Sequence, residues 1–147
     1  MKLSTKTRYG VRSILDLALN YEIEPVSLKE IAARQELPYK YLEHVLAMLR
    51  TAGLVRSVRG SQGGYTLVKP PDQITLREVF DVLEGPEGFV HCTTDPQVCD
   101  RHDMCVTQEV WAHMYAACME VLESTTLEDL VRRARQKRDA SAPMYYI

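Results

Sequence analysis

The sequence lacks the segments that would place the protein in a membrane or direct its export. No apolar run reaches the roughly twenty residues that a membrane-spanning helix needs. The first ten residues, MKLSTKTRYG, have none of the apolar core of a signal peptide. We therefore expect a cytoplasmic protein that does not associate with a membrane.

Patterns of common enzymes are missing as well. The glycine-rich stretch at residues 60–64 has no strand-to-helix context and no Gly-Lys-Ser/Thr after it, so it does not match a phosphate-binding loop. No pattern of a pocket-forming α/β fold or of a cofactor-binding loop is present. His91, His102, Asp103 and Cys105 could be drawn as a nucleophile with a base. Nothing else supports catalysis, and we expect no enzymatic activity.

The composition is that of a folded chain with an uneven charge distribution. With 147 residues, 46% of them hydrophobic, the chain has enough apolar side chains for one domain, or for a small domain plus an appendage. Residues 1–69 carry eleven Lys and Arg against six Asp and Glu, whereas residues 70–147 carry seven against fourteen. The first half is therefore expected to meet a polyanion, although chance scatter of surface charge explains the numbers equally well.

The first half of the chain predicts a helix-turn-helix. An apolar pattern of helical spacing predicts a helix over residues 5–20, and Ser27 with Glu30 forms a capping box for a second helix over 28–34. A tight turn at 35–38 leads to a third helix over 39–51. A plain helical hairpin is the alternative. In a helix-turn-helix, the exposed face carrying Lys40, Glu43 and His44 would lie in the DNA major groove.

The segment that follows predicts a wing. Apolar and polar residues alternate over 54–59, and a second strand is expected at 65–69 after the glycine-rich turn. A β-hairpin directly after a helix-turn-helix makes the unit a winged helix. Arg59 at its tip is expected to enter the DNA minor groove, with Gly60, Ser61 and Gln62 as neighbouring contacts.

Three of the four cysteines, Cys92, Cys99 and Cys105, lie in a stretch with no helical or strand periodicity. Such a long irregular segment predicts a loop that something orders or that functions by moving. Clustered thiols in a reducing compartment indicate a metal centre or a redox sensor. Thiolates suit an iron–sulfur cluster. A zinc site completed by His91 or His102 is open, although no Cys-x₂-Cys is present, and so is a disulfide between Cys92 and either other cysteine.

The last part of the chain predicts a helical stalk. A helix capped by Thr75 is expected over 76–84, and a long helix over 106–124 carries two adjacent apolar stripes with no obvious partner inside so small a chain. Self-association would bury those stripes. Thr126 caps a final helix over 127–137, and the tail is expected to be disordered.

Several sequence pieces together resemble a known family. They are Met1–Lys2–Leu3–Ser4 with Arg8–Tyr9–Gly10, Tyr41–Leu42–Glu43, Gly53–Leu54–Val55, the stretch at 59–67, the three cysteines, Trp111, and Thr126 to Leu130. The chain resembles the Rrf-two family of bacterial winged-helix transcription regulators, and within it the iron–sulfur cluster regulators of the IscR type. The resemblance covers residues 1 to about 137.

The resemblance implies a homodimer that joins through the long helix and binds double-stranded DNA at an inverted repeat. It also implies a 2Fe–2S cluster held by Cys92, Cys99 and Cys105 that controls genes of cluster assembly. IscR-type relatives use a His three residues after the last cysteine, where this chain has Gln108. The fourth ligand is therefore open among His91, His102, Asp103, Gln108, Glu109 and solvent.

Nitric-oxide-sensing relatives take an acidic ligand at the position of Arg8, so this residue favours the IscR-like branch. The alternatives are a nitric-oxide or redox-stress repressor of the same architecture, or a zinc-stabilised DNA-binding protein without sensing. The expected fold class is mainly α, with a winged helix-turn-helix at 1–84 and a cysteine-rich loop at 85–106. A dimerisation helix and C-terminal helix follow at 107–137, and a flexible tail at 138–147.

Overall fold

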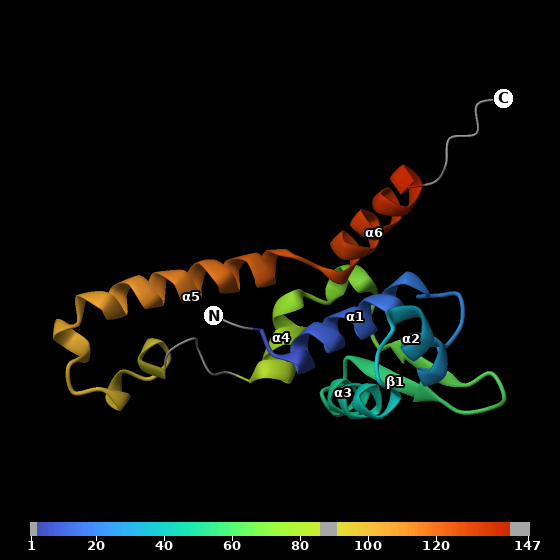
Figure 1. The fold of residues 1–147 in the computed structure, drawn as a ribbon, viewed down its shortest axis with the longest axis horizontal. Coiled ribbons are helices and arrows are strands. Elements are labelled where there is room, and N and C mark those ends of the chain that lie inside the picture. Colours follow the sequence, from blue (N-terminus) through green and yellow to red (C-terminus); the bar gives the residue numbers. More distant parts are fainter. Residues whose placement is uncertain (1–2, 86–90, 142–147) are drawn as a thin grey trace.

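The structure, a computed structural model, describes residues 3–85 and 91–141 (Figure 1). It confirms a mainly helical fold with one antiparallel hairpin. The helices and strands are α1 (Thr5–Leu19), α2 (Leu28–Gln35), α3 (Tyr39–Thr51), β1 (Val55–Val58), β2 (Gly64–Leu67), α4 (Leu76–Glu84), α5 (Val106–Ser124) and α6 (Leu127–Ser141). Single 3-10 turns are η1 (Pro71–Gln73), η2 (His91–Thr93), η3 (Pro96–Val98) and η4 (His102–Met104).

Local hydrogen bonds explain where the helix-turn-helix begins and ends. The Ser27 hydroxyl accepts from the backbone N–H of Glu30, and the Glu30 carboxylate accepts from that of Ser27. This capping box starts α2 as predicted. After α3, Gly53 adopts a positive φ of 75° while its N–H bonds Arg50 and the N–H of Leu54 bonds Leu49. The paired bonds form a Schellman motif, which ends α3 and turns the chain into β1.

The wing pairs β1 with β2 in an antiparallel register that runs from Val55 opposite Leu67 to Val58 opposite Gly64. Its strands are shorter than the predicted stretches at 54–59 and 65–69. Gly64 lies against the chain before α2, where an added Cβ would sit 2.4 Å from the carbonyl oxygen of Val26. Two backbone hydrogen bonds join Val26 and Tyr65 beside it. The wing is therefore fixed to the helix-turn-helix by a close main-chain contact that only glycine permits.

We call α1 to α4, both strands and α6 the head, because they share one core. This core forms where α1 crosses α3 and α4. Gly10 makes this crossing close, because an added Cβ would meet the side chain of Leu83 on α4 at 2.2 Å. Apolar side chains from α1 to α4, both strands and α6 fill the interior; the largest fully buried ones include Ile14, Leu17, Ile31, Leu42, Leu46, Leu49, Leu67, Ile74, Leu83 and Leu127. This interior gives α3 and the wing a rigid support.

The starts of α4 and α6 are joined to each other. Thr75 and Thr126 form an isolated antiparallel bridge, in which Leu76 N–H donates to Thr125 and Leu127 N–H donates to Ile74. Each threonine also caps its own helix: its hydroxyl accepts from an amide three residues ahead. The chain therefore returns to the head at a defined point after α5.

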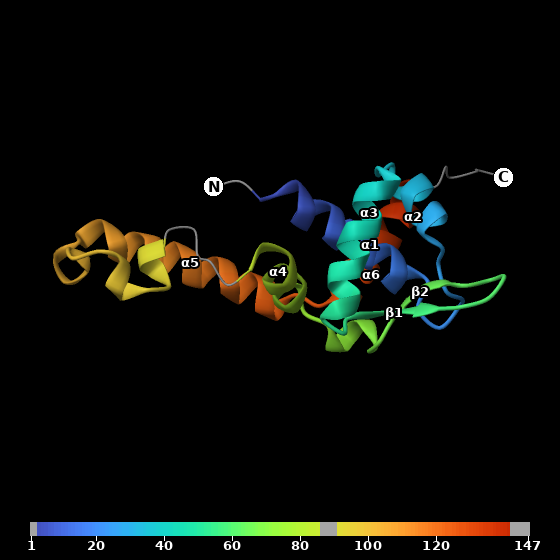
Figure 2. The same ribbon diagram turned by 90° about the horizontal axis from the view of Figure 1, so that it is seen from below.

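α5 leaves the head as an arm, with the cysteine segment at its far end (Figures 1 and 2). Met119 is its one buried residue, while Val106 is 74% and Val121 63% exposed. The prediction that the long helix has an unpartnered apolar face is confirmed for the chain that the structure describes. No helix in residues 3–85 or 91–141 is long and apolar enough to cross a membrane.

Two sequence predictions are wrong in detail. The cysteine segment contains the short turns η2, η3 and η4 rather than no regular structure. Asp95 caps η3 with its side chain, and main-chain bonds from Thr94 and Asp95 to His91 close η2. The last helix continues to Ser141, beyond the predicted end near residue 137. The remainder of the expected flexible tail lies outside the described residues.

Candidate DNA-binding surface and cysteine loop

The exposed face of α3 carries the residues that the sequence assigns to base reading. Lys40, Glu43 and His44 are all exposed, while Leu42 and Val45 on the other face are buried. Tyr41 packs edge-on against Tyr9 of α1, with ring centroids 5.5 Å apart. The helix is therefore held from behind, and its polar face is free to meet a ligand.

The wing lies on the same side of the head as this helix, and its tip extends away from it (Figures 1 and 2). Arg59, Gly60, Ser61 and Gln62 are all exposed at the turn between the two strands. Figure 1 shows α3 and the hairpin on the side of the head opposite α6, and Figure 2 views them from that side. The predicted recognition helix and wing residues therefore share one face of the molecule.

One exposed arginine of the wing was not among the predicted DNA contacts. Arg56 stands on β1 opposite Thr66, and it is exposed. Its position in the apolar–polar alternation of the strand is the sequence signal that could have identified it. It is a second exposed positive charge on the hairpin that carries Arg59 at its turn.

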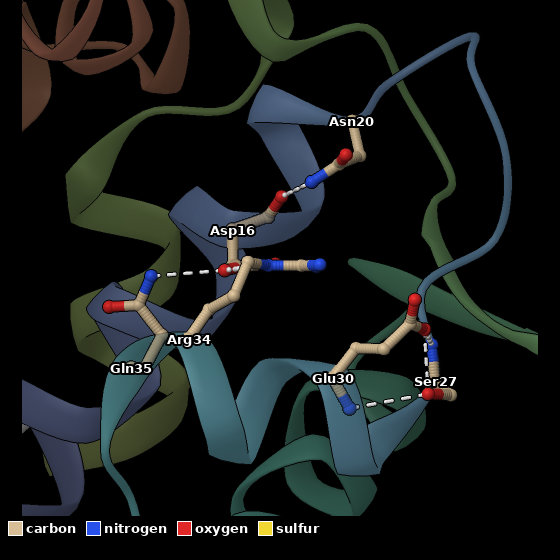
Figure 3. Close-up of polar contacts among 6 residues, drawn as sticks. All are labelled: Asp16, Asn20, Ser27, Glu30, Arg34 and Gln35. Atoms are coloured by element: carbon tan, nitrogen blue, oxygen red, sulfur yellow. Dashed lines mark hydrogen bonds and ion pairs between the residues drawn. The ribbon is translucent and has the colours of Figure 1, made fainter. Parts of the chain in front are cut away.

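A polar network that sequence reasoning also missed joins α1 to α2 (Figure 3). Asp16 is 2% exposed, and its carboxylate accepts from Arg34 Nε at 3.1 Å and Nη2 at 2.7 Å. Gln35 Nε2 donates to the same carboxylate at 3.0 Å. The hydrogen bond that Arg34 donates to the Asp16 carboxylate raises the pKa of Arg34. The available signal was the helical spacing that places Asp16 beside buried Ser13 and Leu17.

The cysteine segment lies along the start of α5. All four cysteines are free; Cys92 and Cys105 are half-buried, and Cys99 is exposed. Cys105 occupies the N-cap position of α5, and its sulfur lies 3.2 Å from the hydroxyl of Thr107. That hydrogen bond, followed by one with the backbone of Gln108, lowers the pKa of the Cys105 thiol. A lowered pKa favours the thiolate, which is the form that binds metal or attacks an oxidant.

The side chain of Gln108 donates to the carbonyl oxygen of Cys92 at 3.4 Å. It ties the first cysteine turn to α5. The residue at the expected fourth-ligand position therefore has a structural contact in this arrangement.

The donor set of the segment suits an iron–sulfur cluster, because three thiols on one short stretch supply three of the four ligands that such a cluster takes. The arrangement differs: within the described residues, no three His, Cys, Asp or Glu side chains are gathered closely enough to hold a metal ion. His102 instead pairs with its neighbour Asp103 at 3.3 Å. Cluster binding would require the turns around Cys92, Cys99 and Cys105 to move together.

A mainly apolar groove of about 1030 Å³ separates α5 from the head. Its lining comes from α1 and α4 on one side and from α5 on the other. The residues are Leu3, Thr7, Arg8, Val11, Arg12, Leu76, Phe80, Ala117, Cys118, Met119, Val121 and Leu122. The groove lies along the helix that was predicted to self-associate.

Comparison with known proteins identifies the family. The family model of Rrf2, described as an iron-dependent transcriptional regulator, matches residues 3–133. The chain belongs to the Rrf2 family. The regulator CymR of Bacillus subtilis is 42% identical over 147 residues, which is all of both chains. This confirms the family that the sequence pieces indicated.

Solved structures agree with this assignment. T. potens IscR has a TM-score of 0.81 and 42% identity, and the match covers 99% of this chain and 97% of that one. CymR, titled the global cysteine regulator of B. subtilis, has a TM-score of 0.78 and 41% identity over 90% of this chain and 98% of that one. The winged-helix fold class is confirmed. The Rrf2-family chain is a DNA-binding transcriptional regulator and not an enzyme.

Proposed function

We propose that this Rrf2-family regulator binds an inverted-repeat operator as a homodimer and that an iron–sulfur cluster on its cysteine segment controls the binding. The observation that carries the proposal is the shared exposed face of α3 and the wing, joined through the head to an arm bearing three thiols. Lys40, Glu43 and His44 would read the major groove. Arg59, Gly60, Ser61 and Gln62 would contact the minor groove.

The homodimer is supported by two complementary features of the head and arm. α5 exposes apolar side chains along its length, with Val110, Trp111, Met114 and Val121 all at least 40% exposed. The groove beside it offers an apolar receptor. A second copy's α5 would cover both surfaces and give the two recognition helices the two-fold relation that an inverted repeat requires.

The effector part of the proposal rests on the three thiols and on the family resemblance. Cys92, Cys99 and Cys105 would hold a 2Fe–2S cluster. The hydrogen bond from the Gln108 side chain to the carbonyl oxygen of Cys92 would either break on cluster binding or be kept. A bound cluster would change its redox state and would order the cysteine segment, and either change could serve as the signal. The chain itself places Cys105 at the residue directly before α5. A rearrangement of the cysteine turns would therefore move the start of α5. The regulated genes would be those of iron–sulfur cluster assembly.

Anaerobic purification tests the effector. The proposal predicts a visibly coloured protein with about two iron and two sulfide per chain. Replacing Cys92, Cys99 and Cys105 with Ala should remove the colour and change affinity for the operator found by promoter footprinting. Cys118→Ala is the control for the colour, because this thiol lies on α5 outside the cysteine segment and should leave the iron and sulfide content unchanged. Colourless protein containing zinc, or unchanged operator binding by the triple variant, would overturn the effector assignment.

A thiol switch is the second candidate, favoured by the lowered pKa of Cys105. In this case hydrogen peroxide would oxidise Cys92 or Cys99 to a sulfenic acid with release of water, and the Cys105 thiolate would attack that sulfur, form a disulfide and release hydroxide. Cluster-free protein treated with hydrogen peroxide would then lose the mass of two hydrogen atoms and change its operator affinity. Reduction with a dithiol should reverse both changes. An iron–sulfur sensor without a switch would show no such reversible mass change.

A further inference from the structure

We propose that Asp16 is a positioning residue for DNA reading, which sets the orientation of the recognition helix by holding the end of α2. The inference rests on the proposed role of α3 in base recognition. It assigns a part in binding to a residue that lies inside the head and on a different helix. The proposal begins from the network in Figure 3, where Arg34 and Gln35 of α2 point toward Asp16 of α1.

The geometry of this network is that of a specific clamp. Arg34 uses Nε and Nη2 on the two oxygens of Asp16, at 3.1 and 2.7 Å, and Gln35 adds a third bond at 3.0 Å. A two-pronged guanidinium–carboxylate pair restricts both distance and angle, which a single contact does not. The Asp16 side chain is 3% exposed and that of Arg34 44%, so the acceptor is fixed in the core while the donor reaches it from the surface.

The clamp formed by Asp16, Arg34 and Gln35 lies at the C-terminal end of α2. Arg34 and Gln35 are the last two residues of α2, and only residues 36–38 separate them from α3. Glu36 takes a left-handed conformation, with φ 53°, which redirects the chain. Because this turn is so short, a rotation of the end of α2 moves the first turn of α3, where Lys40 lies.

The start of α3 has no side-chain cap, and the contact of Tyr41 with Tyr9 holds it from the side of α1. Its N-cap residue is Pro38, which makes no side-chain capping bond, whereas Ser27 and Thr75 cap α2 and α4 with capping boxes. The orientation of the recognition helix therefore depends on its buried apolar face and on the turn that Asp16 anchors. The apolar face keeps α3 folded against the core, and the clamp sets how its polar face is presented.

The same network extends to the dimerisation groove. Arg12, one turn before Asp16 on α1, donates through Nη2 to the main-chain oxygen of Gln35 and through Nε to its side-chain oxygen. Arg12 also lines the groove beside α5. Gln35 therefore receives contacts from both Asp16 and a residue of the groove, which places the end of α2 between the arm and the DNA-reading face.

The test compares sequence-specific with unspecific DNA binding. Asp16→Asn keeps the shape of the side chain but removes its charge and one acceptor, and Arg34→Lys keeps the charge but removes the two-pronged geometry. The probes are a duplex enriched by the wild-type protein from a randomised pool and an unrelated duplex of equal length. Both affinities are measured well below the melting temperature, with the folded fraction checked by circular dichroism.

We expect both variants to bind the enriched duplex about tenfold more weakly, comparable to the loss of one good base contact, and the unrelated duplex unchanged. A residue that only stabilised the fold would leave the affinity of the folded protein unchanged for both probes. The matched control is Asp81→Asn, which breaks an Arg–Asp pair on α4, where Arg77 Nε lies 2.9 and 2.7 Å from the carboxylate oxygens. It should leave both affinities unchanged.

Two results would contradict the positioning role of Asp16. Equal weakening on both probes, or unchanged binding to the enriched duplex, overturns the positioning role. If Asp16→Asn does not fold, Arg34→Lys and Gln35→Ala carry the test, since both changed residues lie on the surface side of the clamp. Lys40→Ala and His44→Ala separate this inference from the function beneath it. If these two keep full specific affinity, base reading by α3 fails; if they lose it while the clamp variants do not, the inference alone fails.

Discussion

Cys105 differs from the other thiols of the cysteine segment in its immediate surroundings. Its sulfur has a hydroxyl at 3.2 Å from Thr107 and stands at the N-terminal end of a helix of nineteen residues. The Thr107 hydrogen bond is the largest cause of its lowered pKa, and the positive charge of Arg101 contributes less. At the scale of one residue, the segment therefore contains a thiol whose pKa lies below that of an ordinary cysteine.

This predicts a measurable pH profile. In reduced, chelator-treated protein, the alkylation rate of Cys105 by iodoacetamide should rise at a lower pH than for an ordinary thiol of pKa 9.0. Thr107→Val removes the largest cause, so the profile should move to higher pH, as followed by peptide mass spectrometry. Thr94→Val is the matched control, because this hydroxyl bonds His91 in the same segment. Identical profiles for Thr107→Val and wild type would contradict the assignment.

Helix starts are the elements that the chain specifies most sharply. Thr75 accepts from the N–H of Glu78 at 3.3 Å, and the Glu78 carboxylate accepts from the N–H of Thr75 at 2.9 Å and from Lys69 at the end of the wing. Burial alone would raise the pKa of Glu78, but these hydrogen bonds and the Lys69 charge lower it overall. One capping box therefore fixes both the start of α4 and the exit of the wing.

We expect Thr75→Ala to lower the free energy of unfolding by about 1 kcal/mol, because a cap bond to the α4 backbone is lost. Urea denaturation followed by circular dichroism measures this change. Thr51→Ala is the matched control: Thr51 is exposed, and its hydroxyl bonds a carbonyl of its own helix at 2.9 Å. Its effect should stay within about 0.5 kcal/mol, as for most surface changes. Equal losses in both variants would show that the capping box contributes nothing special.

The same elements show how far the sequence could be read. The capping boxes at Ser27 and Thr75 span only four residues, so their helices were predicted from the correct start. η2, η3 and η4 depend on a few local hydrogen bonds each and leave no periodic pattern, so they were missed. α6 ran past its predicted end because residues 136–142 contain good helix formers and neither Gly nor Pro.

The candidate site was predicted unevenly for a similar reason. Exposed positions of α3 and the wing follow from helical and strand periodicity, and the structure places all seven predicted residues on the surface. The clamp between Asp16 and Arg34 joins residues eighteen positions apart on different helices, which no local pattern displays. Likewise, spacing showed that three cysteines lie close in sequence but could not show that they are not gathered in space.

At the scale of the whole molecule, the apolar arm and the groove beside it dominate. Val121 is 63% exposed and lines the groove, so a second copy would bury it. A charge at this position costs little in an isolated chain but must be desolvated in the dimer. The same substitution therefore separates the stability of the head from the stability of the assembly.

We expect Val121→Glu to weaken dimerisation at least about tenfold, equivalent to about 1.4 kcal/mol, while leaving the circular dichroism spectrum unchanged. Sedimentation equilibrium over a range of concentrations measures the dissociation constant. Glu120→Gln, on the same helix but outside the groove lining, serves as control and should dimerise normally. A Val121→Glu protein that dimerises as tightly as wild type would show that the groove is not the interface.

The bridge between Thr75 and Thr126 gives the molecule two zones that can open independently. The chain leaves the head after α4 and returns to it before α6. The bridge joins the two ends of this segment, where the carbonyl oxygen of Thr125 accepts from Leu76 N–H. Closing such a loop costs an entropy that grows only with the logarithm of its length. Local openings of the cysteine turns therefore need not propagate past the bridge. We therefore expect the hydrogen-bonded amides of Leu76 and Leu127 to exchange more slowly with solvent than those of the cysteine turns.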